Sequence, residues 1–181
     1  MTPREQFIHD LSAILVKKGS LTEKNALEIQ QAFEESPSDS FDAFLLDEGF
    51  VDREDLLAAL STYYNVPSFE AQGYFFDEIL IRDFPKDVLL RHAVIPLKIE
   101  SGILFLVAAD PQESNLAVVL GHYTNAEMVF FVGLRESICD AVKEFYDISL
   151  MEEEQDEDLR EEFEQERDAH RIVDSEDENE G

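Results

Sequence analysis

The first third of the chain repeats one pattern of apolar and polar positions. Within each copy the apolar positions lie three and four residues apart, as they do on one face of a helix. They are Leu11, Ile14 and Leu15 in the first copy, and Phe41, Phe44 and Leu45 in the second. The pattern predicts that each copy begins with a helix that buries this face.

The residues after each apolar face predict where that helix ends and where the next one begins. Gly19 and Gly49 stand 30 residues apart, at positions where a left-handed residue terminates a helix. Thr22 and Asp52 follow at the same distance from each glycine, and both are favourable N-caps. We therefore expect residues 5–64 to form two helix-turn-helix units that pack against each other.

From residue 66 the pattern changes to short strands that alternate with helices. Pro85 favours a first helical turn, and residues 100–102 favour a tight turn between two strands. The expected strands span 94–99, 103–108 and 127–132, and the first two form a hairpin. The expected helices span about 85–92, 111–123 and 134–146. This order predicts a small α/β arrangement with helices over a short sheet.

The last part of the chain is acidic and poor in apolar residues. Residues 151–181 contain 16 acidic residues and 3 arginines. Such a segment cannot offset the entropy of its own ordering, so we expect it to be largely disordered. The predicted fold class is α+β. It comprises an all-helical tandem-repeat subdomain at 1–65, a small α/β sandwich-like subdomain at 66–147 and an acidic tail at 148–181.

The net charge of the chain limits the classes of partner that we expect it to bind. The net charge of −28 repels nucleic acids and anionic membranes and favours basic partners. Residues 1–33 are balanced, so the acidity lies elsewhere in the chain. No stretch approaches the roughly 20 apolar residues of a membrane span, and the N-terminus lacks a secretory signal pattern. We therefore expect a cytoplasmic protein that does not insert into the membrane.

The sequence contains no motif that predicts catalysis or metal binding. It lacks the G-x-x-x-x-G-K-[ST] loop that cradles ATP phosphates, and its single cysteine excludes an intrachain disulfide. The histidines show no metal-ligand spacing; they are His9, His92, His122 and His170. We expect neither catalytic nor metal-binding residues, and so we do not expect an enzyme.

The repeat and the α/β segment together resemble a known family. Its α/β part has a proline before a short helix, then a hydrophobic-Pro-Leu strand, then an Ala-x-Asp-Pro turn. The corresponding stretches here are Phe84-Pro85, Val94–Leu97 and Ala108–Pro111. Over about residues 8–147 the chain resembles the N-terminal accessory region (MshEN, or the GspE and PilB N-terminal domain) of type II secretion and type IV pilus assembly ATPases. The ATPase domain of that family has no counterpart in this sequence.

In some members of the family the tandem repeat binds cyclic di-GMP. The resemblance makes five residues candidate ligand contacts: Leu11, Lys18, Gly19, Phe41 and Gly49. The polar positions of the family motif have changed, however. Its arginine is Asp10 in one copy and Ser40 in the other, and its small glycine is Ser12 and Asp42. Because loss of the arginine removes a phosphate donor, no cofactor is expected, and cyclic di-GMP is a disfavoured ligand.

The expected function is that of a non-catalytic interaction or regulatory module that acts by protein–protein contact. By resemblance, the expected partner is a secretion or pilus motor ATPase or its membrane-platform protein. Two alternatives remain. One is a degenerate cyclic di-GMP receptor, and the other is an acidic charge mimic that binds a basic partner through its tail.

Overall fold

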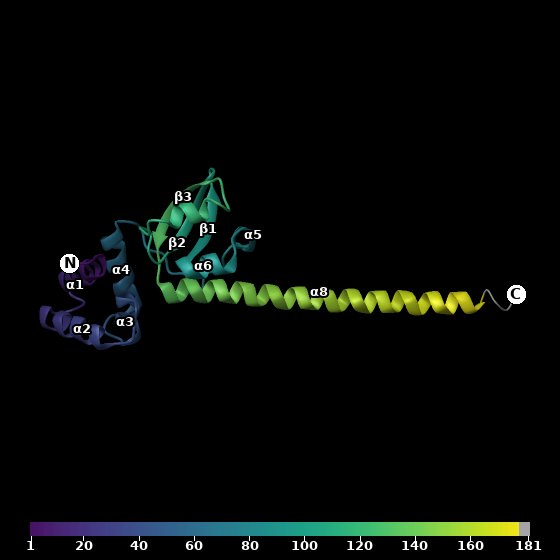
Figure 1. Ribbon diagram of the computed structural model, residues 1–181, viewed down its shortest axis with the longest axis horizontal. Helices are drawn as coiled ribbons and strands as arrows, with labels where there is room; N and C mark the ends of the chain where they lie inside the picture. The colour runs from purple at the N-terminus through teal and green to yellow at the C-terminus, as the bar shows by residue number, and fades with distance from the viewer. Residues whose placement is uncertain (178–181) are drawn as a thin grey trace. The chain divides into compact units, whose positions relative to one another are not determined.

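The computed structural model describes residues 1–177, except for the side chains of residues 149–153 and 170–177. Contacts within the chain divide it into two units, residues 1–142 and residues 143–181. Figure 1 shows the order of the elements along the chain by colour. Six helices, α1 to α6, precede a three-stranded sheet in the first unit, which confirms the predicted α+β class. Among the described residues no helix is long and apolar enough to cross a membrane.

The first unit begins with two helical hairpins, α1–α2 and α3–α4. Their helices are α1 (Pro3–Lys18), α2 (Glu23–Glu35), α3 (Phe41–Asp47) and α4 (Arg53–Tyr64). Thr22 caps α2 by accepting the Asn25 N–H at 3.1 Å. Asp52 caps α4 by accepting the Asp55 N–H at 2.8 Å. Both predicted N-caps are therefore confirmed.

Both hairpins turn at a glycine in the left-handed region. The backbone angle φ is 82° at Gly19 and 71° at Gly49. The residue after each glycine closes the turn in the same way. The Ser20 N–H donates to the Leu15 carbonyl at 3.0 Å, and the Phe50 N–H donates to the Leu45 carbonyl at 3.0 Å. The two copies close with the same hydrogen-bond pattern, as the repeat in the sequence predicts.

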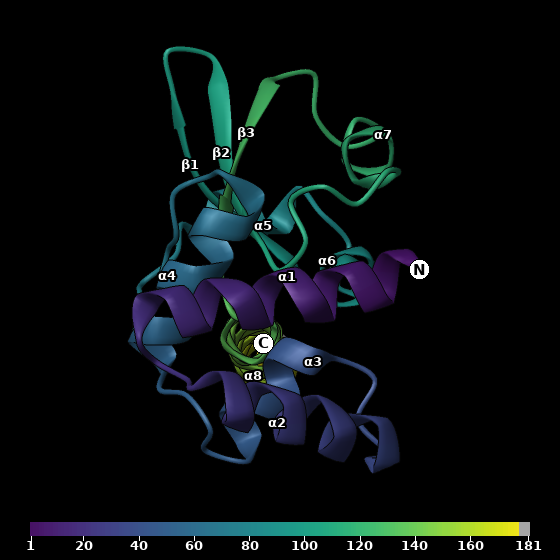
Figure 2. The ribbon, with the colours of Figure 1, turned by 90° about the vertical axis from the view of Figure 1, so that its left-hand side faces the viewer.

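Residues 66–142 supply a small sheet and short helices. The strands are β1 (Val94–Glu100), β2 (Ile103–Ala108) and β3 (Glu127–Val132). The helices are α5 (Glu78–Arg82), α6 (Lys86–His92) and α7 (Leu116–Leu120), followed by the start of α8 (Arg135–Asp177). Figure 2 shows β2 between its neighbours, antiparallel to β1 and parallel to β3. The predicted hairpin and all three predicted strands are confirmed.

One core joins the helical hairpins to the sheet. α1 packs against α2 and α4, and α4 packs against β3. Leu11, Leu15 and Leu45 are fully buried in this core. Val132, the last residue of β3, and Leu134, just before α8, belong to the same cluster. The hairpins and the sheet therefore fold as one packed unit.

The helix predicted over residues 111–123 is wrong in its length. α7 covers only Leu116–Leu120, and turns occupy most of the preceding residues. The Asp110 carboxylate accepts the Gln112 N–H at 3.0 Å, and the Asp110 carbonyl accepts the Glu113 N–H at 3.2 Å. The side-chain bond offers the backbone a local partner that competes with helix formation.

The sequence pattern also does not predict α5. The Asp77 carboxylate caps this helix by accepting the Ile79 N–H at 2.9 Å. The helix has only 5 residues, which is too short to show a helical period.

The last helix differs most from the prediction. α8 has 43 residues, whereas the sequence predicts a helix to about residue 146 and a largely disordered tail at 148–181. Residues 135–177 contain neither glycine nor proline and are rich in Glu, which is a good helix former. A helical backbone therefore replaces the expected disorder as far as Asp177. Residues 178–181 of the predicted tail lie outside the described residues.

Candidate functional site

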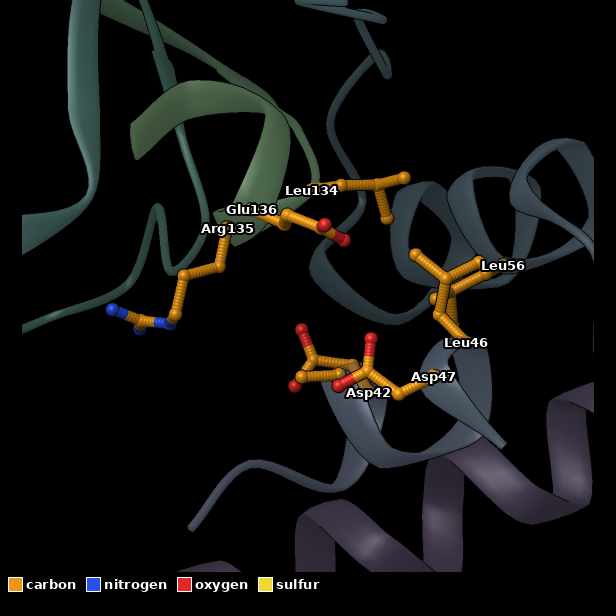
Figure 3. Close-up of a pocket in the computed structure, with 8 residues that line it drawn as sticks. Asp42, Leu46, Asp47, Leu56, Leu134, Arg135 and Glu136 are labelled. Carbon is orange, nitrogen blue, oxygen red and sulfur yellow. The ribbon is translucent and has the colours of Figure 1, made fainter. Parts of the chain in front are cut away.

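Two cavities in the first unit meet at Asp42 and Arg135, which line both of them. The first, the leucine cleft, has a volume of about 340 Å³ and is drawn in Figure 3. It is lined by Asp42, Ala43, Leu46, Asp47, Leu56, Leu134, Arg135 and Glu136. The second, the tyrosine cavity, has a volume of about 440 Å³. Its lining includes Arg4, Phe7, Phe41, Asp42, Tyr63, Tyr64, Asp110, Gln112 and Arg135. We call the two cavities together the groove.

The leucine cleft lies where α3, α4 and the first turn of α8 meet. Leu56 of α4 and Leu134 before α8 are almost completely buried. Leu46 of α3 is half-buried beside them. Figure 3 shows these three side chains gathered at one end of the cleft, so the cleft has an apolar floor.

Carboxylates surround this floor. In Figure 3 the carboxylates of Asp42 and Asp47, both on α3, point toward the gap that Glu136 faces from α8. The Arg135 guanidinium is directed away from them. The Ser40 hydroxyl, which caps α3, donates a hydrogen bond to the Asp42 carboxylate and so orients it. The cleft therefore combines an apolar floor with a negative rim.

The tyrosine cavity is more polar and more aromatic. Burial raises the pKa of Tyr64 well above its usual value, and the negative charges of Asp110 and Asp42 raise it further. Arg135 acts in the opposite direction but does not cancel these effects. The Tyr64 phenol is therefore neutral at any physiological pH.

Asp110 is the second perturbed group of this cavity. Burial raises the pKa of its carboxyl, although the Gln112 N–H and the charge of Arg135 oppose the shift. Gln112 also donates its side-chain amide to the Tyr64 carbonyl at 3.5 Å, which ties the loop after β2 to the end of α4. The tyrosine cavity therefore offers hydrogen-bonding groups and charged groups to a ligand.

Within residues 1–177 no cluster of three or more His, Cys, Asp or Glu side chains is placed to hold a metal ion.

An arginine next to the groove fixes the start of α8 against α4. The Arg53 guanidinium bonds to both carboxylate oxygens of Glu70 at 3.4 Å and also donates to the Ser137 hydroxyl. Burial disfavours the charged form of Glu70, but the Gln72 N–H and Arg53 outweigh it and lower the pKa of Glu70. This bridge joins α4 to the sheet region, and so it positions the residues at both sides of the leucine cleft.

The first hairpin carries a cavity equivalent to the leucine cleft. It has a volume of about 530 Å³ and lies between α1 and α2. Five of its lining residues each precede a lining residue of the leucine cleft by 30 positions: Ser12, Ala13, Val16, Lys17 and Ala26. Their counterparts are Asp42, Ala43, Leu46, Asp47 and Leu56. The repeat therefore builds the same surface twice, with lysine in one copy where the other has aspartate.

Part of the chain matches a known family. The family model of the MshEN domain matches residues 64–152. This segment is MshEN-like. It supplies Tyr64, Ala109, Asp110, Gln112, Leu134, Arg135 and Glu136 to the groove, and the remaining lining residues come from α1, from α3 with the two residues before it, and from α4. The groove thus lies along the junction between the MshEN-like segment and the helical hairpins.

Solved structures share this fold. A structure of MshE with cdg has a TM-score of 0.60 at 17% identity, covering 75% of this chain and 98% of that chain. The N-terminal domain of XpsE has a TM-score of 0.55 at 21% identity, covering 75% of this chain and 92% of that chain. No curated protein matches the chain. The MshEN match and the shared fold confirm the resemblance to the N-terminal region of secretion and pilus ATPases.

All five ligand-contact residues predicted from the sequence precede the MshEN-like segment. Leu11 is fully buried in the core, and Lys18 is exposed at the end of α1. Gly19 and Gly49 occupy the left-handed turns of the two hairpins. Only Phe41 lines the groove, where its ring lies 5.2 Å from that of Phe33 in the core. Leu11 and Phe41 belong to the same core cluster, and the role of all five residues in binding a ligand stays a prediction.

Sequence reasoning missed most residues of the groove. The sequence pattern places Asp110 only in the Ala108–Pro111 turn and Arg135 only in a predicted helix. A usable signal does exist in the repeat, because Lys17 and Asp47 occupy equivalent positions with opposite charge. Such a reversal at an exposed position of an otherwise matching pattern indicates that the two copies present surfaces of different charge.

Proposed function

We propose that the protein is a non-catalytic interaction module that binds a protein partner through the groove. The observation that carries this proposal is the leucine cleft, where Leu46 leaves apolar surface accessible above the buried Leu56 and Leu134, within a ring of charged side chains. Apolar clefts rimmed by polar groups are typical of docking sites. The fold shared with the N-terminal domain of XpsE supports a role as an accessory domain.

The partner class follows from the resemblance. We infer that the chain contacts a motor ATPase of a type II secretion or type IV pilus system, or the platform protein of such a system. The MshEN-like segment and the negative charge of the chain support this inference, because a strongly acidic surface favours a partner with a basic surface. In the cell, the protein would act in the cytoplasm by occupying a docking site or by regulating the motor.

A binding experiment with two matched variants tests the proposal. The full chain is immobilised, and purified motor ATPases and platform-protein cytoplasmic domains from the same organism are passed over it. Asp47→Arg reverses a charge at the rim of the leucine cleft, whereas Glu34→Arg makes the same change on α2, away from the groove. We expect saturable binding that Asp47→Arg weakens and Glu34→Arg preserves. Absence of binding to every such protein, or equal effects of both variants, would contradict the proposal.

A degenerate cyclic di-GMP receptor is the second candidate, supported by the fold shared with the structure of MshE with cdg. Electrostatics oppose it. Asp10 stands at the arginine position of the motif, and hydrogen bonds from His9 and Gln6 lower the pKa of its carboxyl. The position is therefore negative at neutral pH, where a phosphate needs a positive group. Calorimetry with cyclic di-GMP separates the candidates: saturable heat favours the receptor, and no heat at high-micromolar ligand removes it.

A further inference from the structure

Arg135, the one cation among the residues that line the leucine cleft, does not face the carboxylates of its rim. Asp47 and Glu136 are exposed, and neither forms an ion pair with any residue in the described part of the chain. Asp42 is bonded to the neutral Ser40 hydroxyl. Arg135 is directed away from the three carboxylates and contributes instead to the tyrosine cavity, where it lowers the pKa of Asp110. A positive group that enters the cleft would meet three carboxylates without displacing an existing partner.

The floor determines what kind of positive group fits. Leu46 offers apolar surface above the buried side chains of Leu56 and Leu134, and a small hydrated ion cannot use that surface. A lysine or arginine side chain can use it, because its methylene stem packs on apolar surface while the charged head reaches carboxylates. A volume of about 340 Å³ also leaves room for a neighbouring aliphatic side chain beside that stem. The cleft therefore suits a segment of a protein better than an ion.

We propose that the leucine cleft binds a basic amphipathic helix of a partner protein. Such a helix places a leucine or isoleucine on the floor, with lysine or arginine one turn away against Asp42, Asp47 and Glu136. This inference rests on the proposed function and adds the chemistry of the partner segment.

Charge excludes the other available occupants. The chain's own α8 is acidic over residues 151–177, so neither this helix nor that of a second copy complements a negative rim. The equivalent cavity of the first hairpin has Lys17 at the position of Asp47, so it does not attract a cationic segment. The reversal gives the chain an internal control that shares five equivalent lining positions.

The test uses the full chain and a synthetic amphipathic peptide of leucine and lysine, about 18 residues long. Two control peptides keep its length: in one, glutamate replaces lysine, and in the other, serine replaces leucine. Affinities are measured by calorimetry at about 150 mM salt, which screens long-range attraction to the acidic helix. The cleft variant is Asp42→Asn/Asp47→Asn/Glu136→Gln. The control variant is Glu161→Gln/Glu162→Gln/Glu164→Gln, which removes the same charge from α8.

We expect the leucine–lysine peptide to bind the native chain more tightly than either control peptide. The cleft variant should weaken this binding about tenfold, which corresponds to about 1.4 kcal/mol, and the α8 variant less than about twofold. Equal losses in the two variants would show attraction by bulk charge and overturn the inference. So would unchanged affinity of the cleft variant, or equal binding of the glutamate peptide. Circular dichroism of each variant confirms that it is folded.

The two proposals fail in different ways. If the chain binds a motor or platform protein but not the peptide, the assignment of the cleft fails and the interaction module stands. If the peptide binds in the cleft but no motor or platform protein binds, the partner class is wrong and the cleft chemistry stands.

Discussion

The two helical hairpins share a backbone and a core pattern, but their equivalent cavities differ in charge. Leu15 and Leu45 are both fully buried, and both copies turn at a left-handed glycine. Around the cavities, however, the first copy has Ser12 and Lys17 where the second has Asp42 and Asp47. The apolar positions of the repeat therefore maintain the fold, whereas its polar positions differ between the copies and give each cavity its own charge.

The hairpins differ also in how they join the rest of the unit. Arg53 in the second hairpin bonds to Glu70 and Ser137, whereas the equivalent position in the first hairpin is Glu23, on the exposed surface. The second hairpin alone supplies the residues of the leucine cleft that face α8. We therefore expect the packing positions of the two hairpins to respond alike to mutation and the polar positions to respond differently.

The largest effect is expected at the shared core. Leu15→Ala and Leu45→Ala each remove a fully buried side chain, so each should lower the free energy of unfolding by about 3 kcal/mol. Leu27→Ala, at an exposed position of α2, should cost less than about 0.5 kcal/mol. Urea denaturation measures all three. A large loss for only one of the buried pair would break the equivalence of the two copies.

A smaller effect is expected at the two turns. Gly19→Ala and Gly49→Ala should each cost about 1 kcal/mol, because alanine is strained at positive φ. No atom lies within 4 Å of an added Cβ at either glycine, so the cost is conformational and not steric. Substitution by asparagine, which tolerates this conformation, should therefore cost less than alanine. Equal costs for asparagine and alanine at both turns would argue for a crowding effect instead.

At Ser12 we expect a substitution to stabilise the chain, whereas the substitutions above destabilise it. Its hydroxyl is buried and has no hydrogen-bond partner in the described part of the chain. Ser12→Ala should raise the free energy of unfolding by about 1 kcal/mol, because an unsatisfied buried hydroxyl is removed. At the equivalent position, Asp42→Ala removes the partner of the Ser40 hydroxyl, so it should bring no such gain. Thermal denaturation compares the two variants, and a loss of stability in Ser12→Ala would contradict the assignment.

The smallest effect concerns the bridge between the second hairpin and the sheet, and it depends on pH. Because the pKa of Glu70 is lowered in the folded chain, its contribution is present above its unfolded pKa of about 4.3 and is lost as pH falls through the folded value. Both side chains are about one-third exposed, so solvent screening keeps the ion-pair contribution below about 1 kcal/mol. Arg53→Ala should therefore destabilise the chain more at pH 7 than at about pH 3. An equal loss at both pH values, measured by urea denaturation, would show that packing and not charge carries the effect.

Much of the fold could be predicted because its signals are local. A few neighbouring residues are enough to predict each of these features: the left-handed glycines, the caps Thr22 and Asp52, and the three strands. The errors also have local causes. Asp110 competes with the helix by bonding to the Gln112 N–H, and the absence of glycine and proline after residue 135 extends α8.

The groove was less predictable because it is assembled from distant segments. Asp42 and Glu136 are almost a hundred positions apart, and only the tertiary fold of the first unit brings them to one cleft. The comparison of the repeat with the family motif directed attention to positions such as Leu11, which the structure places in the core. The opposite charges at Lys17 and Asp47 were present in the sequence, but only the matching cavities give that reversal a meaning.

Exchanging the two charges within one chain tests the central claim most directly. The double variant Lys17→Asp/Asp47→Lys keeps the net charge of −28 and alters only which hairpin cavity carries the aspartate. The affinity of the leucine–lysine peptide is measured by calorimetry for the native and exchanged chains. The account predicts about a tenfold loss in the exchanged chain, because the lysine now stands among the remaining cleft carboxylates. An unchanged affinity would contradict the claim that the negative rim of the leucine cleft selects the partner.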